Sequence, residues 1–196
     1  MEERIKAEYQ AYLLQIQQIQ GEAPPQKRRK YAKRDKYKVI RDLCSAMVLC
    51  HNVTPRIEND QRVFQASSPD EVALVKISEE LSMQLVERDQ NSILIENANG
   101  EKEKYKILAN FPFTSESKRM GIILKNEETK RIIFYLKGAD TVIKNKVPEV
   151  QRGFLLEECE SLAREGLRTL CFCQKVLLEQ EYLKWNKEYE DAQNTI

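Results

Sequence analysis

The chain has 196 residues, of which 41% are hydrophobic and 32% are charged, and its formal net charge is +1. This composition is typical of a folded domain with an apolar core, and the near-neutral charge excludes a general bias toward nucleic acid or anionic membrane. No apolar run approaches the roughly 18 to 20 residues needed to cross a bilayer, and the start MEERIKAEYQ lacks the apolar core of a signal peptide. We therefore expect this stretch to be soluble.

Five cysteines are spread along the chain without a C-x-x-C pair. The odd number and the lack of a disulfide framework predict a reducing compartment. The neighbours Cys50 and His51 raise the question of zinc. The chain has one histidine and no second cluster of ligands, so we expect no metal held by its side chains and buried thiols instead.

Residues 1–34 are expected to stand apart from the main domain. Apolar residues at helical spacing predict an amphipathic helix over Glu2–Gln20, and a basic run follows between Lys27 and Lys38. Such a run is either a solvated linker or insertion, or a segment that binds RNA, anionic lipid or a targeting receptor. The chain is thus divided into 1–34, a helix with a basic linker, and 35–196, the main domain.

The main domain is predicted to begin with a helix from Val39 and a short strand over Arg62–Ala66. The inward side of this helix is predicted to carry Ile40, Leu43, Met47 and Cys50.

A second helix has a strong start signal, with Ser68 at the N-cap, Pro69 at the first helical position and Glu71 three residues after the cap. Glu71 then has two interpretations. Its carboxylate completes a capping box by reaching back to the N-cap amide, or it contacts a ligand. The residues expected to face inward are Ala73, Leu74, Ile77 and Leu81.

A meander of short strands follows, over 84–87, 92–96 and 105–108. Two further apolar runs, Met120–Leu124 and Ile132–Leu136, are joined by the polar turn KNEETKR and predict an antiparallel hairpin. A hairpin brings its outer ends together, so Phe113 and Lys118 should lie close to Lys137 and Gly138. An aromatic ring beside lysines, at a glycine that permits close approach, is a plausible site for a flat anionic ligand such as a nucleotide.

The C-terminal third is predicted to hold a short helix capped by Asp140, a longer one from Pro148, a strand over 167–176 and a last helix over Glu179–Ala192. Gly166 fits the left-handed position that follows a helix. The inward stripe of the longer helix is predicted to consist of Phe154, Leu155, Cys159, Leu162 and Ala163. Because strands mostly follow one another without crossover helices, we predict an α+β fold: an antiparallel β-sheet of about six or seven strands flanked by helices.

Four separated segments together resemble the nucleotide-binding (N) domain of P-type ATPases. They are SSPDEVALV at 67–75, FPFTSESKRM at 111–120, KGAD at 137–140 and REGLRTL at 164–170, in the order and spacing of that domain. The SPDE and KGAD forms are similar to those of the type-IV branch, the phospholipid flippases. LCHNVTP at 49–55 with FTSESKRMGII resembles the subgroup found on Golgi and endosomal membranes. The resemblance covers about 35–176.

The resemblance implies a role for each of six positions. Phe113 would stack on adenine, Lys137 with Gly138 would form the floor of the adenosine pocket, and Glu71 would approach the adenine edge. Lys118 would be a second pocket lysine, and Arg168 would meet the phosphates. The residue types suit these roles, because aromatic rings stack on bases and arginine offers a forked donor to phosphate. From the pattern alone, Phe113 is alternatively a core residue, Arg168 a surface strand residue paired with Glu165, and Lys118 a solvated side chain.

The resemblance further implies that the parent protein is a phospholipid-transporting ATPase on the cytosolic side of an intracellular membrane, Golgi or endosome. Its cofactors would be ATP and Mg²⁺, and its partners the phosphorylation and actuator domains of the same chain, with phospholipid as cargo and no nucleic acid. The sequence contains neither DKTGT, whose aspartate takes the phosphoryl group in the family, nor the Walker loop G-x-x-x-x-G-K-[ST]. We therefore expect no catalytic residue here and no turnover of ATP by this stretch alone. The alternative function is a non-catalytic α+β module that uses the Lys27–Lys38 run.

Overall fold

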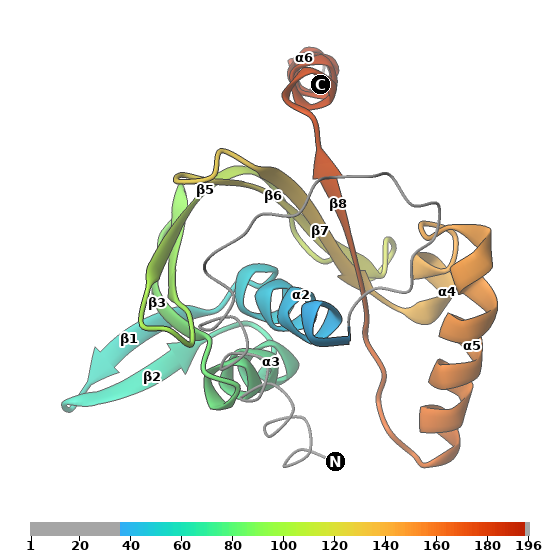
Figure 1. Ribbon diagram of the computed structural model, residues 1–196, viewed down its shortest axis with the longest axis horizontal. Helices are drawn as coiled ribbons and strands as arrows, with labels where there is room; N and C mark the ends of the chain where they lie inside the picture. The colour runs from blue at the N-terminus through green and yellow to red at the C-terminus, as the bar shows by residue number, and fades with distance from the viewer. Residues whose placement is uncertain (1–35, 195–196) are drawn as a thin grey trace, which may run out of the picture. The chain divides into compact units, whose positions relative to one another are not determined.

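The computed structural model describes residues 36–194. The helix predicted over Glu2–Gln20 and the basic run as far as Asp35 lie outside these residues. The described chain is α+β, as predicted, with five helices, one sheet of two strands and one of six (Figure 1). It forms two compact units, each made of two segments. The first consists of the described residues up to Glu87 together with Ile95–Lys102, and the second consists of Arg88–Leu94 together with the residues from Glu103 onward. None of the helices between residues 36 and 194 is long and apolar enough to span a bilayer.

The first unit contains two helices that contact each other, and a separate hairpin. Its elements are α2 (Lys36–Leu49), β1 (Thr54–Glu58), β2 (Gln61–Gln65), α3 (Pro69–Glu80) and most of β3 (Gln84–Arg88). Strand β2 confirms the predicted strand to within a residue, whereas β1 was not predicted. Asn59 and Asp60 join the two strands with positive φ angles of 51° and 59°, the combination that a tight two-residue hairpin turn requires.

The predicted inward faces of both helices are partly wrong. In α2, Leu43 is 44% exposed while Cys44 is buried, and in α3, Ala73 is exposed while Val75 and Ser78 are buried. Polar residues can occupy a buried face when they are hydrogen-bonded, and the Ser78 hydroxyl donates to the Leu74 carbonyl at 2.9 Å. Apolar spacing alone could not reveal this.

His51 lies two residues after the end of α2, and its side chain has a structural role. Its imidazole is fully buried, Nδ1 accepts a hydrogen bond from the Val53 amide at 2.9 Å, and Nε2 lies 2.7 Å from the Val48 carbonyl. Because Nδ1 accepts, the proton belongs on Nε2, which donates to one of the carbonyls that a helix end leaves unpaired. The described residues contain no group of three or more His, Cys, Asp or Glu side chains that could hold a metal ion.

The six-stranded sheet follows chain order, β3-β4-β5-β6-β7-β8. The remaining elements are β4 (Ser92–Glu96), β5 (Lys102–Phe111), β6 (Arg119–Asn126), β7 (Ile132–Gly138), α4 (Asp140–Ile143), α5 (Glu149–Arg164), β8 (Cys171–Leu177) and α6 (Glu179–Gln193). Strands β5 to β8 are antiparallel neighbours, although two helices separate β7 from β8 in sequence. The predicted meander and hairpin are thereby confirmed.

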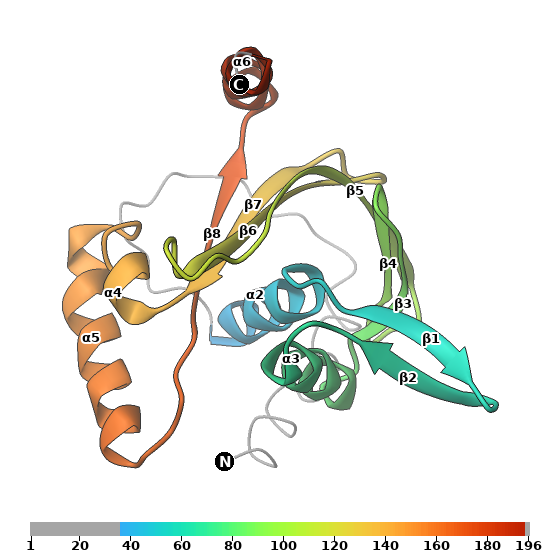
Figure 2. The same ribbon diagram turned by 180° about the vertical axis from the view of Figure 1, so that it is seen from behind.

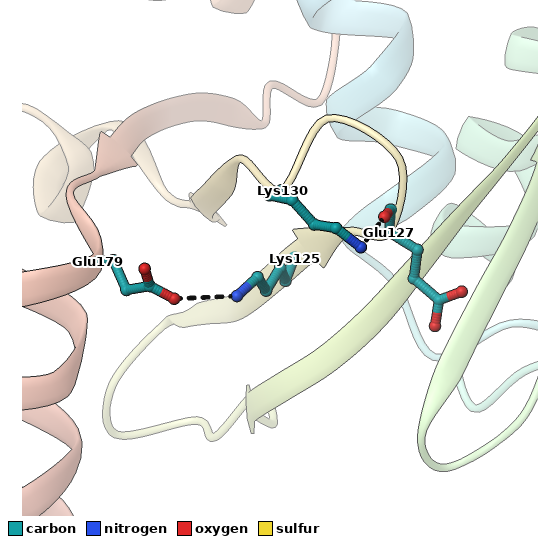
Figure 3. A network of polar contacts seen from close by, with 4 residues as sticks. All are labelled: Lys125, Glu127, Lys130 and Glu179. Carbon is teal, nitrogen blue, oxygen red and sulfur yellow. Dashed lines mark hydrogen bonds and ion pairs between the residues drawn. The ribbon is translucent and has the colours of Figure 1, made fainter.

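One face of β5–β8 carries two apolar clusters that hold the last three helices. Toward α6, Ala109, Ile123 and Ile132 pack against Tyr182 and Trp185. Figure 2 shows α6 beyond one end of β8, and α4 with α5 near the other end. There the second cluster combines Leu136, Ile143 and Cys171 with Leu155 and Cys159 of α5. Helix α6 is also joined to the sheet by an ion pair between Lys125 and Glu179, at 3.1 Å (Figure 3).

Two details of the C-terminal third differ from prediction. Asp140 is the first residue of α4 and does not cap it, since the N-cap is Ala139. In α5, Phe154 is 69% exposed and no residue is fully buried, so the predicted stripe is narrower than five residues. Gly166 does take the left-handed conformation, with φ of 79°, and the Leu167 amide bonds the Leu162 carbonyl at 3.1 Å, the closure expected at such a helix end.

Candidate nucleotide-binding site

The outer ends of the β6–β7 hairpin meet as the sequence predicts. Arg119 is paired with Gly138, and Met120 with Lys137. Strand β8 continues the row on the other side, because Lys137 is paired with Phe172 and Gly138 with Cys171. The beginning of β6, the end of β7 and the beginning of β8 therefore lie side by side at one end of these strands. We call this end of the strands, in the second unit, the edge.

Gly138 permits a backbone contact that no larger residue could keep. A Cβ placed there would lie 2.6 Å from the carbonyl oxygen of Lys118 and 3.0 Å from Cα of Arg119. The Ala139 amide donates to the same Lys118 carbonyl at 3.2 Å. Lys118 itself has φ of 49°, which costs a residue with a side chain of order 1–3 kcal/mol. The loop before β6 is thus drawn tightly against the end of β7.

Phe113 lies on that loop, and its side chain is 61% exposed. The interpretation of Phe113 as a core residue is therefore wrong. The core aromatic in this segment is Phe111, whose ring packs edge-on against Phe134, Trp185 and Tyr189 with centroid distances of 5.8–6.0 Å. Phe113 is thus an exposed benzyl ring two residues from a partly buried aromatic cluster.

Lys137 is only 6% exposed, although it ends a strand. Directly paired residues of antiparallel strands point to the same face, so Lys137 shares its face with Met120 and Phe172. Met120 is 1% exposed, as expected for core.

The two other cationic candidates are exposed. Lys118 lies at the end of the loop that carries Phe113. Arg168 lies in the connection between α5 and β8 and not in the predicted strand, because β8 starts at Cys171. Three residues span at most about 10 Å, so Arg168 is tethered to the edge that Gly138 and Lys137 form.

Glu71 belongs to the first unit, whereas the other five candidates belong to the second. Glu71 is buried, with 9% exposure, and its Oε2 accepts a hydrogen bond from the Asn52 amide at 3.3 Å. Ser68 is the N-cap and Pro69 follows it, as predicted, but the Ser68 side chain makes no capping bond. The reciprocal capping box is therefore wrong in its serine half, and Glu71 links α3 to the segment after α2.

Sequence reasoning noted Ser117 beside Lys118 but did not single out Thr114 or the bonds between Thr114 and Ser117. Thr114 Oγ1 accepts from the Ser117 amide at 3.0 Å and donates to Ser117 Oγ at 2.8 Å. Both are ordinary turn formers, and their spacing of three residues was the available signal.

The Cys171 thiol beside this edge is unreactive as a nucleophile. The pKa of Cys171 is raised to about 12, chiefly by burial and further by the Cys159 thiol, whose sulfur lies 3.5 Å away. At neutral pH Cys171 therefore stays protonated and offers no thiolate nucleophile. The candidate residues gathered near this edge are aromatic and cationic.

Comparison with known proteins identifies the family. Residues 39–196 match the family model described as P-type ATPase, cytoplasmic domain N. Similar curated proteins include the phospholipid-transporting ATPase NEO1 of Saccharomyces cerevisiae, 46% identical over 154 residues, which are 78% of this chain and 13% of that protein. The probable phospholipid-transporting ATPase IIB of Homo sapiens is 43% identical over 173 residues, 78% of this chain and 15% of that protein. The probable phospholipid-transporting ATPase tat-5 of Caenorhabditis elegans is 44% identical over 161 residues, 80% and 15% respectively.

The matched stretch thus spans about one seventh of the length of these relatives. With the α+β sheet and the family match on 39–196 together, the chain belongs to the P-type ATPase cytoplasmic domain N family.

Proposed function

We propose that residues 35–196 are the ATP-binding domain of a phospholipid-transporting P-type ATPase, and that residues 1–34 form a linker or insertion before it. Family membership supports ATP as the ligand, and the printed names of the relatives support phospholipid transport as the activity of the parent protein. The observation that carries the proposal is the exposed Phe113 ring on a loop that is hydrogen-bonded, through the Lys118 carbonyl, to Ala139, two residues after the buried Lys137.

In this proposal each candidate residue has a distinct task. Phe113 stacks on adenine, an interaction worth roughly 1–3 kcal/mol for a base on an aromatic ring. Lys137 and Gly138 form the floor, where the missing side chain of glycine lets the loop before β6 close against the end of β7. Lys118 and Arg168 neutralise phosphate charge, with arginine offering two donors to one phosphate. Glu71 accepts from the adenine edge.

The domain would present the nucleotide, and the chemistry would occur elsewhere in the parent. Mg-ATP held here would meet an aspartate on the phosphorylation domain, where in-line phosphoryl transfer depends on positioning and charge neutralisation. Mg²⁺ would be held with the phosphates, mainly by that other domain. The actuator domain and a phospholipid would be the further partners, on the cytosolic side of a Golgi or endosomal membrane.

An ATP titration of the 196-residue chain, followed by amide chemical shifts, tests the ligand. Stacking and a few polar contacts, without the metal and phosphate contacts of a second domain, predict a Kd on the order of 0.1 to several mM. ADP and AMP should bind nearly as well, because all three share the base. The shifts should concentrate at Glu71, Phe113, Lys137 and Arg168.

Three substitutions sharpen this test. Phe113→Ala and Lys137→Met should each weaken ATP binding about fivefold or more, since one loses the stack and the other loses the charge while keeping the stem. Phe154→Ala is the matched control, because Phe154 is a comparably exposed phenylalanine of the same unit, on α5. Sub-micromolar affinity, a steep preference for ATP over AMP, or equal effects of Phe113→Ala and Phe154→Ala would contradict the proposal.

A further inference from the structure

The loop between β5 and β6 holds Phe113 from both sides. On its N-terminal side Pro112 fixes its own φ near −65° and restricts the conformation of Phe111. On its C-terminal side Thr114 makes two hydrogen bonds to Ser117, one through the Ser117 amide and one between the hydroxyls. We call this pair the Thr114–Ser117 clasp. Phe113 is thus an exposed ring on a backbone with little freedom.

The clasp is connected to the strand that carries Lys137. The Lys118 amide donates to the Thr114 carbonyl at 2.9 Å, and the Lys118 carbonyl accepts from the Ala139 amide at 3.2 Å. Lys118 adopts its left-handed conformation between these two bonds. A continuous path of hydrogen bonds therefore runs from the residue after Phe113 to the residue after Gly138.

The hydroxyl groups add to the backbone bond from the Lys118 amide to the Thr114 carbonyl, which closes the same turn. A threonine hydroxyl has one proton, which Thr114 gives to Ser117 Oγ while its oxygen receives the Ser117 amide. The Ser117 proton is then directed to a carbonyl, with Arg119 at 3.2 Å and Thr114 at 3.4 Å. A valine at 114 would keep the shape of threonine and lose both bonds of the clasp.

We propose that Thr114 is a positioning residue: through the Thr114–Ser117 clasp it fixes the distance between the Phe113 ring and Lys137, and so sets the affinity for the purine base. This rests on the proposed function, because it presupposes that Phe113 and Lys137 bind one nucleotide. Lys118 in a strained conformation, held on both sides by hydrogen bonds, is what a pre-organised site requires.

The test compares Thr114→Val and Thr114→Ser in the full chain by ATP, ADP and AMP titrations. Thr114→Val should weaken all three nucleotides by the same factor, about three- to tenfold, the range that one net hydrogen bond covers. Thr114→Ser keeps the hydroxyl, so its affinity for the three nucleotides should stay within about twofold of that of the parent chain. Thr129→Val is the matched control, because Thr129 is exposed in the turn at the opposite end of the β6–β7 hairpin.

A double substitution separates positioning from general damage. If the clasp acts through the ring, Thr114→Val should have no effect on binding in a chain that already carries Phe113→Ala, whereas a purely structural defect would weaken binding again. The proposal is overturned if Thr114→Val binds ATP like the parent, if Thr114→Ser fails to restore binding, or if the two changes add. If the parent chain itself binds no nucleotide, the proposed function fails instead.

Discussion

Gly138 shows at the scale of one residue how the backbone sets the site. Because a Cβ at this position would meet backbone atoms of Lys118 and Arg119, the strands must separate to admit any side chain. We predict that Gly138→Ala lowers the free energy of unfolding by about 1–3 kcal/mol, measured by urea denaturation.

The control for Gly138 is Gly153, in the interior of α5, where a Cβ would meet nothing within 4 Å. Gly153→Ala should raise the free energy of unfolding by about 0.5–1 kcal/mol, because alanine is the better helix former. Equal effects of the two substitutions would show that the close approach at Gly138 is not the reason for its glycine.

His51 is a second position where one side chain satisfies the backbone. His51→Ala would leave the buried Val53 amide without its Nδ1 acceptor, and we predict a loss of at least about 1–3 kcal/mol in the free energy of unfolding. His51→Asn retains an acceptor in a similar place and should lose less. If the alanine variant unfolds at the same urea concentration as the parent, the imidazole is not the structural group that we describe.

At the scale of the element, the β3–β4 turn depends on a single carboxylate. Asp89 Oδ1 accepts from the amides of Asn91 and Ser92, both at 2.6 Å, and Oδ2 accepts from the Ser92 hydroxyl at 3.0 Å. These hydrogen bonds, first those of the backbone amides, hold the pKa of Asp89 below its ordinary value of 3.8. The turn is therefore stabilised by the ionised form.

The sign of the pH effect follows. Since the pKa is lower in the folded state, the stabilisation is complete above the ordinary pKa and is lost as the pH falls through the lowered one. We predict that, between about pH 5 and pH 2, the parent chain loses more stability than Asp89→Asn, which keeps an acceptor but does not titrate. Parallel stability curves for the two chains would refute this role of Asp89.

Several elements follow from local sequence signals, and others do not. The β6–β7 hairpin, the start of α3 at Ser68 and the glycine that ends α5 all rest on interactions within a few residues. Strand β1 was missed because Pro55 and exposed charges hide its pattern. The faces of α2 and α5 were misassigned because tertiary packing, not apolar spacing, decides which side of a helix is covered.

The same division holds for the site. The hairpin predicts that the ends of β6 and β7 meet, and strand pairing does place Arg119 opposite Gly138, with the Lys118 backbone beside it. It cannot predict the Thr114–Ser117 clasp, since hydroxyl bonds in a turn depend on the conformation that the turn adopts. Arg168 was placed in a strand because Leu167 and Leu170 beside it are apolar, although β8 begins only at Cys171.

At the scale of the whole molecule, the chain divides into two compact units. The part of it that aligns with the three relatives described above covers 13–15% of their length. Five of the six candidate residues belong to one unit and Glu71 to the other. The amide of Glu71 is therefore an independent reporter in the ATP titration, because its shift tests the participation of the first unit separately from that of Phe113 and Lys137.

The turn between β6 and β7 lies at the opposite end of the hairpin from Lys137 and Gly138. It determines which residues of the two strands are paired, and so which side chains of β7 lie on each face. Asn126 Oδ1 accepts from the amides of Glu128 and Thr129, at 3.0 and 2.7 Å, and so fixes how the chain reverses. If the reversal were one residue longer or shorter, odd and even positions of β7 would exchange faces, and the ammonium group of Lys137 would take the side now held by Leu136. Which side of the sheet carries positive charge is thus decided by an amide oxygen a full strand length away.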